Sequence, residues 1–164
     1  NRYFVRTAIC IRSSISIVLA AVTRSIIIGI VSTLVFFLIV DIKITNLFYI
    51  FYSAFFGSFF IGSLGFVTGL WATKFDHTAT ITNFIITPLA FLSGVFYTID
   101  KLPFIFQTIS FFNPFFHIIN IFRYGFIGVS DGSIFFGMIY LPILALLAWF
   151  LAFILYKKGY KIKS

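Results

Sequence analysis

Acidic side chains are scarce in this sequence, and each lies at the edge of an apolar run. The chain has four aspartates and no glutamate: Asp41, Asp76, Asp100 and Asp131. Ion-coupled carriers usually need a buried carboxylate at membrane depth, and intramembrane proteases need a Ser/His or Asp/Asp pair there. The acids at the run edges supply neither, so we expect no catalytic residue.

The other residues that could do chemistry are equally isolated. His77 and His117 have no carboxylate or serine at a triad spacing, and Cys10 is the single cysteine. The spacing of Cys and His fits no metal site, and no Gly-rich phosphate loop is present. We therefore expect no metal and no cofactor, so that energy for uphill transport would have to come from another protein.

The composition indicates a membrane protein. The 164 residues are 61% hydrophobic and 10% charged, with a mean hydropathy of +1.12, whereas soluble domains carry about 25% charged residues. The net charge of +8 could suit nucleic acid. The basic residues, however, gather at the chain ends and between apolar runs, which favours lipid as the partner over nucleic acid.

Four uncharged or nearly uncharged runs are long enough to cross a membrane, which takes about 20 residues of helix. They predict spans at about residues 18–40, 47–70, 81–98 and 134–156. The fold expected is an all-α polytopic membrane helix bundle, with residues 1–164 forming a single transmembrane domain.

The run 102–122 carries polar residues and a helix-breaking Asn113-Pro114 pair. We interpret it as a re-entrant hairpin of two short helices in the last outer loop, at about 103–112 and 114–126; a plain fifth span is the alternative. With four spans, eight Lys and Arg lie on the side of both chain ends and three on the other. This bias predicts that both ends are cytoplasmic.

Small residues recur on one face of the second predicted span. The spacings of four, four, three and four residues join Ala54, Ser58, Gly62, Gly65 and Gly69. Such a stripe lets helices approach closely in lipid. It could serve packing within the chain, a subunit interface or a surface along which helices slide during transport. Arg24 is the only charge deep in an apolar run, and it either snorkels to the cytoplasmic interface or acts inside the membrane.

One segment resembles a known family. Residues 85–100 read IITPLAFLSGVFYTID, followed by KLP and then by FFNPFFHIINIFRYGFIGVSD. The order of these motifs, best from residue 62 to 131, resembles type-2 ABC transporter permeases, the membrane subunits of ATP-binding-cassette exporters. The resembling features are Thr87-Pro88-Leu89, the GVFY stretch, Leu102-Pro103, Asn113-Pro114 and Arg123-Tyr124-Gly125.

The resemblance implies a six-span permease of a plasma membrane, such as a bacterial inner membrane, of which this chain holds the last four spans. It implies a homodimer or paired permease, an ABC ATP-binding subunit as partner, and no enzyme activity in the chain itself. The substrate could be an amphipathic, lipid-like or drug-like molecule. The rival function is a non-transporting membrane anchor.

The same resemblance assigns roles to two groups of residues. Coupling to the ATPase is expected at the cytoplasmic residues Arg2, Arg6, Arg12, Lys74 and Asp76. The outer hairpin, and a kink in the preceding span, are expected at Pro88, Gly94, Tyr97, Asp100, Pro103, Asn113, Pro114 and Arg123.

Overall fold

The computed structural model describes residues 2–39, 44–72, 75–95 and 101–157, and every long element in these ranges is helical. This confirms the all-α class. The elements are α1 (Arg2–Ile39), α2 (Leu47–Trp71), α3 (Phe75–Ile81), the π-helical segment η1 (Thr82–Ile86), α4 (Thr87–Phe91), α5 (Phe104–Phe112), α6 (Pro114–Ile127) and α7 (Ile134–Lys157).

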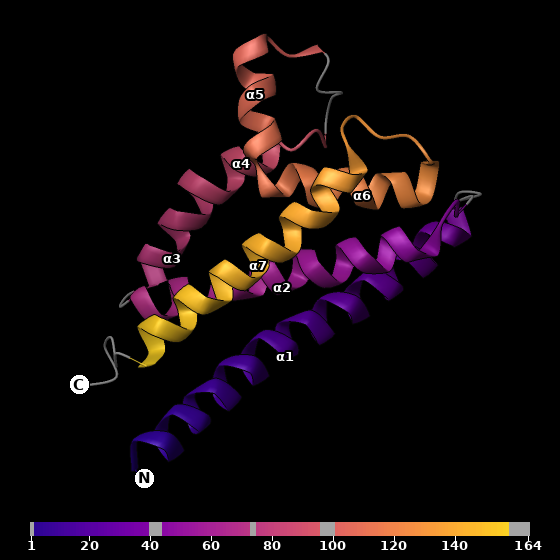
Figure 1. The fold of residues 1–164 in the computed structure, drawn as a ribbon. Helices are drawn as coiled ribbons and strands as arrows, with labels where there is room; N and C mark the ends of the chain where they lie inside the picture. Colours follow the sequence, from indigo (N-terminus) through magenta and orange to yellow (C-terminus); the bar gives the residue numbers. More distant parts are fainter. Residues whose placement is uncertain (1, 40–43, 73–74, 96–100, 158–164) are drawn as a thin grey trace.

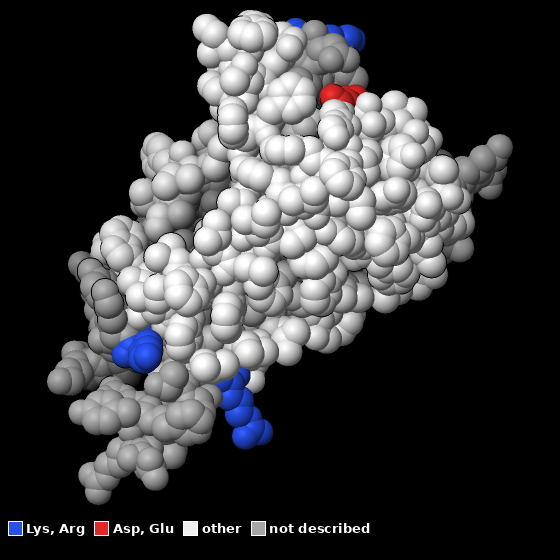
Figure 2. All heavy atoms as spheres, in the orientation of Figure 1, with Lys and Arg blue, Asp and Glu red and all other residues white. Residues whose placement is uncertain are grey.

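Helix α2 is the centre of the bundle, because α1, α6 and α7 all lie against it. The start of α1 and the end of α7 lie at one end of the bundle, which we call the terminal end; α5 and α6 lie at the opposite, hairpin end (Figure 1). The core between α2 and α7 is formed by Phe60, Ala145 and Ala148. On the face shown in Figure 2 the surface is almost entirely uncharged, with charges gathered towards its two ends.

Among the described residues, three helices are long and apolar enough to cross a membrane: residues Cys10–Ile39 of α1, α2 and α7. A fourth candidate is the pair α5–α6, which bends by 84° between Phe112 and Pro114. A bend of this size excludes a straight fifth span and leaves either a broken span or the re-entrant hairpin that the Asn113-Pro114 sequence predicts. Helix α1 has 38 residues and is about 57 Å long, so it extends well beyond a hydrocarbon core of about 30 Å.

Of the four predicted spans, the third, expected at residues 81–98, differs most from the structure. Helical structure runs from Phe75 to Phe91 through α3, η1 and α4, which we call the broken helix. It ends early because the chain turns at Leu92–Gly94, where Gly94 has a φ of 78°, a conformation that favours glycine. Residues 96–98 lie outside the described part.

The expected kink at Pro88 takes the form of a π-helical turn. Proline has no N–H to bond the carbonyl four residues before it, and π turns are one way in which a helix absorbs such a disruption. Here the segment η1 precedes Pro88, and both the N–H and the hydroxyl of Thr87 bond to the Thr82 carbonyl, the hydroxyl at 2.9 Å. The distortion therefore lies one turn before the proline.

Helix α7 contains a second interior proline, Pro142. Its missing N–H frees the carbonyl of Met138, four residues earlier. The Tyr52 hydroxyl of α2 donates to that carbonyl at 2.5 Å. A side chain of α2 thus takes the place of the hydrogen bond that α7 cannot make for itself.

Candidate functional site

The hairpin is built by residues that end one helix and begin the next. Asn113 follows the last residue of α5, and its side-chain oxygen accepts a hydrogen bond from the Phe115 N–H at 3.0 Å, capping α6. Pro114 occupies the first position of α6, where its missing N–H costs nothing. At the other end of the hairpin, the exposed Pro103 precedes α5.

Three helix ends meet beside Asn113, and side chains bond the carbonyls that those ends leave free. The Asn113 amide donates to Leu89 O of α4 at 2.6 Å, and the Ser110 hydroxyl donates to Leu92 O at 2.9 Å. Both side chains are buried, at 2% and 0% exposure. Because a buried carbonyl without a donor is costly, these bonds fix the end of the broken helix to the bend of the hairpin.

The last carbonyls of α5 are bonded in the same way. His117 Nε2 lies 2.8 Å from Phe111 O, and the Tyr140 hydroxyl of α7 donates to Phe112 O at 2.7 Å. We call the four side chains Ser110, Asn113, His117 and Tyr140 the hairpin junction. Through them, α4, α5, α6 and α7 are joined by side chain-to-backbone bonds.

The loop after α6 is held by a small polar cluster. Arg123 and Asp131 form an ion pair of 2.6 Å. The Asn120 side chain accepts from the Asp131 N–H at 2.9 Å and donates to Gly132 O at 3.3 Å. Asn120 is 1% exposed, whereas the side chains of Arg123 and Asp131 are 24% and 8% exposed. The cluster therefore lies at the edge of the protein interior, where it fixes the approach to α7.

Helix α6 packs on α2 through glycines. A Cβ placed on Gly57 would lie 2.9 Å from a methyl carbon of Ile118, and one on Gly125 would lie 2.5 Å from Ile50 Cγ1 and 3.0 Å from its backbone nitrogen. The Gly125 carbonyl also accepts the N–H groups of Thr45, at 3.1 Å, and Asn46, at 2.9 Å. The Arg-Tyr-Gly motif thus contains a position, residue 125, that only glycine can occupy without displacing α2.

The small-residue stripe of α2 is divided in the structure. Gly62 packs on α1, where its Cβ would lie 3.0 Å from Ala21 Cβ, whereas Gly65 and Gly69 face open space. The positions of α2 buried inside the chain are different ones, namely Ser53, Gly57, Phe60, Ser63 and Phe66. Ala54 and Ser58, the other stripe members, are partly buried. Packing within the chain therefore uses a neighbouring face of α2.

Arg24 lies at the middle depth of the bundle. Ala21 lies opposite Gly62, and three residues further towards the hairpin end, about 4.5 Å along the helix, Arg24 is level with Phe59, the middle residue of α2. The Arg24 side chain is exposed, and the part of the chain that the structure describes offers it no ion pair. Snorkelling to the terminal end would therefore have to cover about half the span.

Of the residues expected to couple to an ATPase, the structure describes only some. Arg12 is exposed on α1, near the terminal end. Arg2 and Arg6 belong to α1 and Asp76 to α3, but their side chains lie outside the described part, as do Lys74, Tyr97 and Asp100 entirely. The stretch before the first span is no separate surface element, because α1 is continuous from Arg2.

The chemistry available at the hairpin end is structural. Across residues 2–39, 44–72, 75–95 and 101–157, no three His, Cys, Asp or Glu side chains gather as a metal site would require. The junction consists of amides, hydroxyls and an imidazole that are bonded to backbone carbonyls. Such an arrangement positions helices rather than a reacting molecule.

Comparison of the sequence with known protein families identifies one family that it matches. The family described as "ABC-2 type transporter" matches residues 9–127, well over half of the chain. This stretch includes most of α1 together with α2, the broken helix, α5 and α6. Two of the residues that sequence reasoning did not single out, Gly57 and Tyr52, also lie within it.

Two relatives match shorter stretches. Inner membrane transport permease YadH of Escherichia coli K12 is 42% identical over 67 residues, which are 41% of this chain and 26% of the relative. Nodulation protein J of Rhizobium leguminosarum bv. trifolii is 39% identical over 61 residues, 37% of this chain and 23% of the relative. The match thus spans about a quarter of each relative's length. No solved structure matches the chain significantly.

Proposed function

Because this chain belongs to the ABC-2 type transporter family, we propose that it is the membrane-spanning permease part of an ATP-driven exporter, with ATP hydrolysed by a separate ABC ATP-binding subunit. The relative from Escherichia coli is named an inner membrane transport permease, which supports transport as the activity. An amphipathic molecule is the substrate class we favour, since the described bundle is lined and covered by apolar side chains.

The observation that carries this proposal is the loose attachment of the broken helix. Among the described elements, α3 lies against α2 and α4 lies against α6, while η1 lies against neither. No residue of η1 or α4 is buried, and Phe84 is 77% exposed. A helix that is held at its ends and weakened by a π turn can move relative to the bundle, as alternating exposure of a substrate path requires.

Force from an ATPase would enter at the terminal end. We assign the first contact to residues 1–13 at the terminal end of α1, where Arg12 is exposed. Residues 71–78, which include Asp76, form a second contact. Both chain ends are cytoplasmic in this proposal, in agreement with the excess of Lys and Arg on that side. Binding of the arginines to lipid headgroups alone is the competing interpretation.

Cys10 tests the orientation and the coupling together, because it is the only thiol of the chain. A membrane-impermeant maleimide should label it only after the membrane is opened. With the ATP-binding subunit present, a short crosslinker from Cys10 should reach engineered cysteines on that subunit. Labelling in sealed cells would show that the orientation is the opposite one. Transport without any crosslink would show that the start of α1 binds lipid headgroups rather than the ATP-binding subunit.

Nucleotide binding separates a permease from a protein with its own energy source. The purified chain should bind no ATP at micromolar concentration, whereas vesicles that contain the chain and its ATP-binding subunit should consume ATP and move substrate. A chain that binds nucleotide alone would overturn the proposal. A chain that assembles with partners but changes neither ATP consumption nor transport would be the membrane anchor.

Pairing with a second permease chain completes the proposed assembly. A Cβ added at the stripe residues Gly65 and Gly69 would meet nothing within 4 Å inside the described chain. A glycine face on a membrane helix suits close approach of another helix, so we assign the pairing to this face. Crosslinking between cysteines introduced at Gly69 in two copies should form dimers; its absence in an active transporter would place the interface elsewhere.

A further inference from the structure

A row of polar and small residues follows the outer side of α1 from the terminal end to the middle of the bundle. Arg12, Ser16, Ala20 and Arg24 are spaced by four residues, so they form one ridge along the helix. All four are exposed. The next position of this ridge is the apolar Ile28, which is 55% exposed. The polar part of the ridge therefore ends at Arg24.

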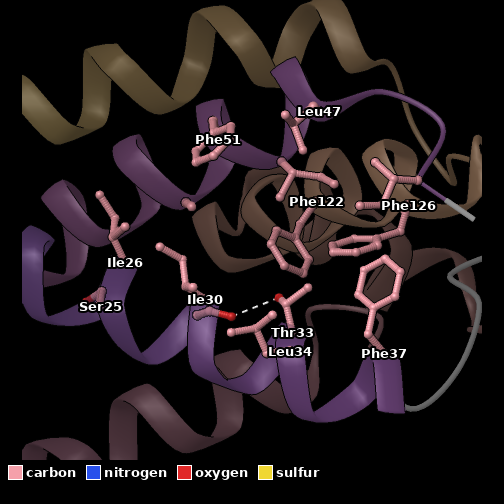
Figure 3. A pocket seen from close by; sticks show the side chains of 14 residues that line it. Ser25, Ile26, Ile30, Thr33, Leu34, Phe37, Leu47, Phe51, Phe122 and Phe126 are labelled. Atoms are coloured by element: carbon pink, nitrogen blue, oxygen red, sulfur yellow. Dashed lines mark hydrogen bonds between the residues drawn. The ribbon is translucent and has the colours of Figure 1, made fainter. Parts of the chain in front are cut away.

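Arg24 lies on the side of α1 that faces away from α2 and α6. The α1 residues that face those helices line an apolar pocket, and they include Ser25, Ile26, Ile30 and Thr33 (Figure 3). Arg24 is not among the lining residues, and its side chain is exposed. Since the described chain offers it no ion pair, the charge has no counter-charge among the described residues.

The depth of Arg24 makes a counter-charge necessary. A charged side chain at the centre of a bilayer is costly, and such residues almost always face the interior of a helix bundle or a water-filled cavity. Arg24 is level with Phe59, which lies about 18 Å from either end of α2. Lipid headgroups at both ends are therefore beyond the reach of one snorkelling side chain.

The acids of this chain do not supply the counter-charge. The sequence has four aspartates, all at the edges of apolar runs, and no glutamate. Asp131, whose side chain the structure describes, is already paired with Arg123. A second copy of the chain would bring the same four acids at the same positions. An anion that arrives from water is the partner that the ridge favours, and a carboxylate on a neighbouring span is the rival.

The ridge between Arg12 and Arg24 is suited to contact with water. The Ser16 hydroxyl donates to Arg12 O at 2.8 Å, and the Thr23 hydroxyl, beside Arg24, donates to Leu19 O at 2.9 Å. Both hydroxyl oxygens keep lone pairs that can accept from water. Positive charge at both ends of the ridge attracts anions. The ridge thus provides a polar route from the terminal end to the middle of the bundle.

We propose that this ridge lines a water-filled path from the terminal end, and that Arg24 at its inner end binds the anionic group of the exported molecule, a carboxylate or a phosphate. A guanidinium group can donate two parallel hydrogen bonds to the oxygens of such a group. The assignment of the anion to the exported molecule rests on the proposed function, and it narrows the amphipathic substrate class to anionic amphipaths.

Thiol reactivity on the two sides of Arg24 tests the path. The full chain, carrying Cys10→Ser, is given one new cysteine as Ala20→Cys or as Ile28→Cys, each four residues from Arg24. Membrane vesicles of both orientations are treated with an anionic or a cationic methanethiosulfonate, which reacts with the thiolate in water. We expect Ala20→Cys to react in the orientation that exposes the terminal end, and Ile28→Cys to stay unmodified in both.

The charge of Arg24 should appear in the ratio of the two rates. Four residues of helix are about 6 Å long, and at this distance in water a unit charge changes the local concentration of each reagent about threefold, in opposite directions. The ratio of anionic to cationic rates at Ala20→Cys should therefore fall about tenfold in Arg24→Gln and be kept in Arg24→Lys. An unchanged ratio in Arg24→Gln would overturn the anion site, as expected if a carboxylate on a neighbouring span neutralises Arg24.

Protection by an amphipath tests the substrate class. Dodecyl phosphate below its critical micelle concentration should stop the modification of Ala20→Cys, whereas dodecyltrimethylammonium should not. The protection should be lost in Arg24→Gln and kept in Arg24→Lys. Equal protection by the two amphipaths would show partition into the membrane rather than binding at Arg24, and would overturn the proposal.

Two further outcomes oppose the proposal. If Ala20→Cys reacts in neither orientation, lipid or another helix covers the ridge. If Ala20→Cys and Ile28→Cys react equally, water does not stop at Arg24. The thiol rates require no ATP, so an anion site without ATP-driven transport would contradict only the proposed function, and transport without the anion site would contradict only this inference.

Discussion

The packing of α6 on α2 gives the sharpest mutational prediction, because the obstacle at Gly125 includes backbone atoms. A methyl group in Gly125→Ala would lie 2.5 Å from Ile50 Cγ1, 3.0 Å from the Ile50 nitrogen and 3.1 Å from Asn46 O. The Ile50 side chain can rotate, but the backbone of α2 cannot yield locally. Helix α6 must therefore move away from α2.

The magnitude follows from two effects of that movement. Overpacking costs about 1–3 kcal/mol. The two hydrogen bonds from the Thr45 and Asn46 N–H groups to Gly125 O, at 3.1 and 2.9 Å, would lengthen, at about 0.5–1.5 kcal/mol each. We expect Gly125→Ala to lower the free energy of unfolding by about 2–4 kcal/mol, more than a typical contact between membrane helices of about 1 kcal/mol.

The assay is reversible unfolding of the chain in mixed micelles, followed by far-ultraviolet circular dichroism. Gly65→Ala is the matched control: its Cβ meets nothing, so it should be neutral or stabilise by up to about 1 kcal/mol through helix propensity. Adding Ile50→Ala to Gly125→Ala should recover only part of the loss, since the backbone contacts remain. Equal stability of Gly125→Ala and Gly65→Ala would refute the close-approach reasoning, and full recovery would refute the role of the backbone.

Three further changes probe other contacts. Asn113→Ser keeps a side-chain oxygen to cap α6 but loses the donor to α4, so it should cost about 1–2 kcal/mol and Asn113→Ala more in the same unfolding assay; equal costs would deny the link to α4. Tyr52→Phe should lower the free energy of unfolding by about 1 kcal/mol, because it leaves Met138 O without a donor. In the Pro142→Ala background, where the helix can supply a donor, most of that cost should disappear. A double-mutant cycle that shows no coupling between the two positions would contradict this. Arg24→Leu should leave unfolding unchanged or improve it, because the described chain pairs no acid with Arg24, and a loss of transport without a loss of stability would mark it as a functional charge.

Much of the fold follows from the sequence because hydropathy and helix breakers act locally. Apolar runs of span length become helices in lipid, where every backbone group must be bonded within the chain. The bend at Asn113-Pro114 is also local, since asparagine caps a helix and proline begins one. The two short helices and the bend between them therefore appear in the structure as the sequence predicts, with α5 ending at Phe112 and α6 beginning at Pro114.

The faces of the helices could not be predicted with the same success. In water, the buried face of a helix is its apolar face, but α2 is apolar all round and carries small residues on several faces. The spacing of Gly62, Gly65 and Gly69 is as regular as that of Ser53 and Gly57, yet only Gly62 among those three glycines packs inside the chain. The choice depends on the shape of α1 and α6, which local spacing does not contain.

The bond from Tyr52 to Met138 shows the same limit at the level of one atom. Pro142 tells a reader of the sequence that the carbonyl four residues earlier needs a donor. It does not tell which of the eight tyrosines or many other polar groups will supply it. Only the packing of α2 on α7 brings Tyr52 to that carbonyl.

These contacts divide the bundle into a fixed part and a part that can move. Helices α2 and α7 are joined by the bond from Tyr52, α2 and α6 by the close approach at Gly125, and α7 and α5 by the bond from Tyr140. No residue of η1 or α4 is buried, and at the hairpin end the bonds from Ser110 and Asn113 attach the broken helix to the bend. Each of those bonds contributes about 1 kcal/mol, an amount small enough for the proposed ATP-binding subunit to overcome. Motion of the broken helix would therefore begin by releasing these two carbonyls, while α6 stays on α2.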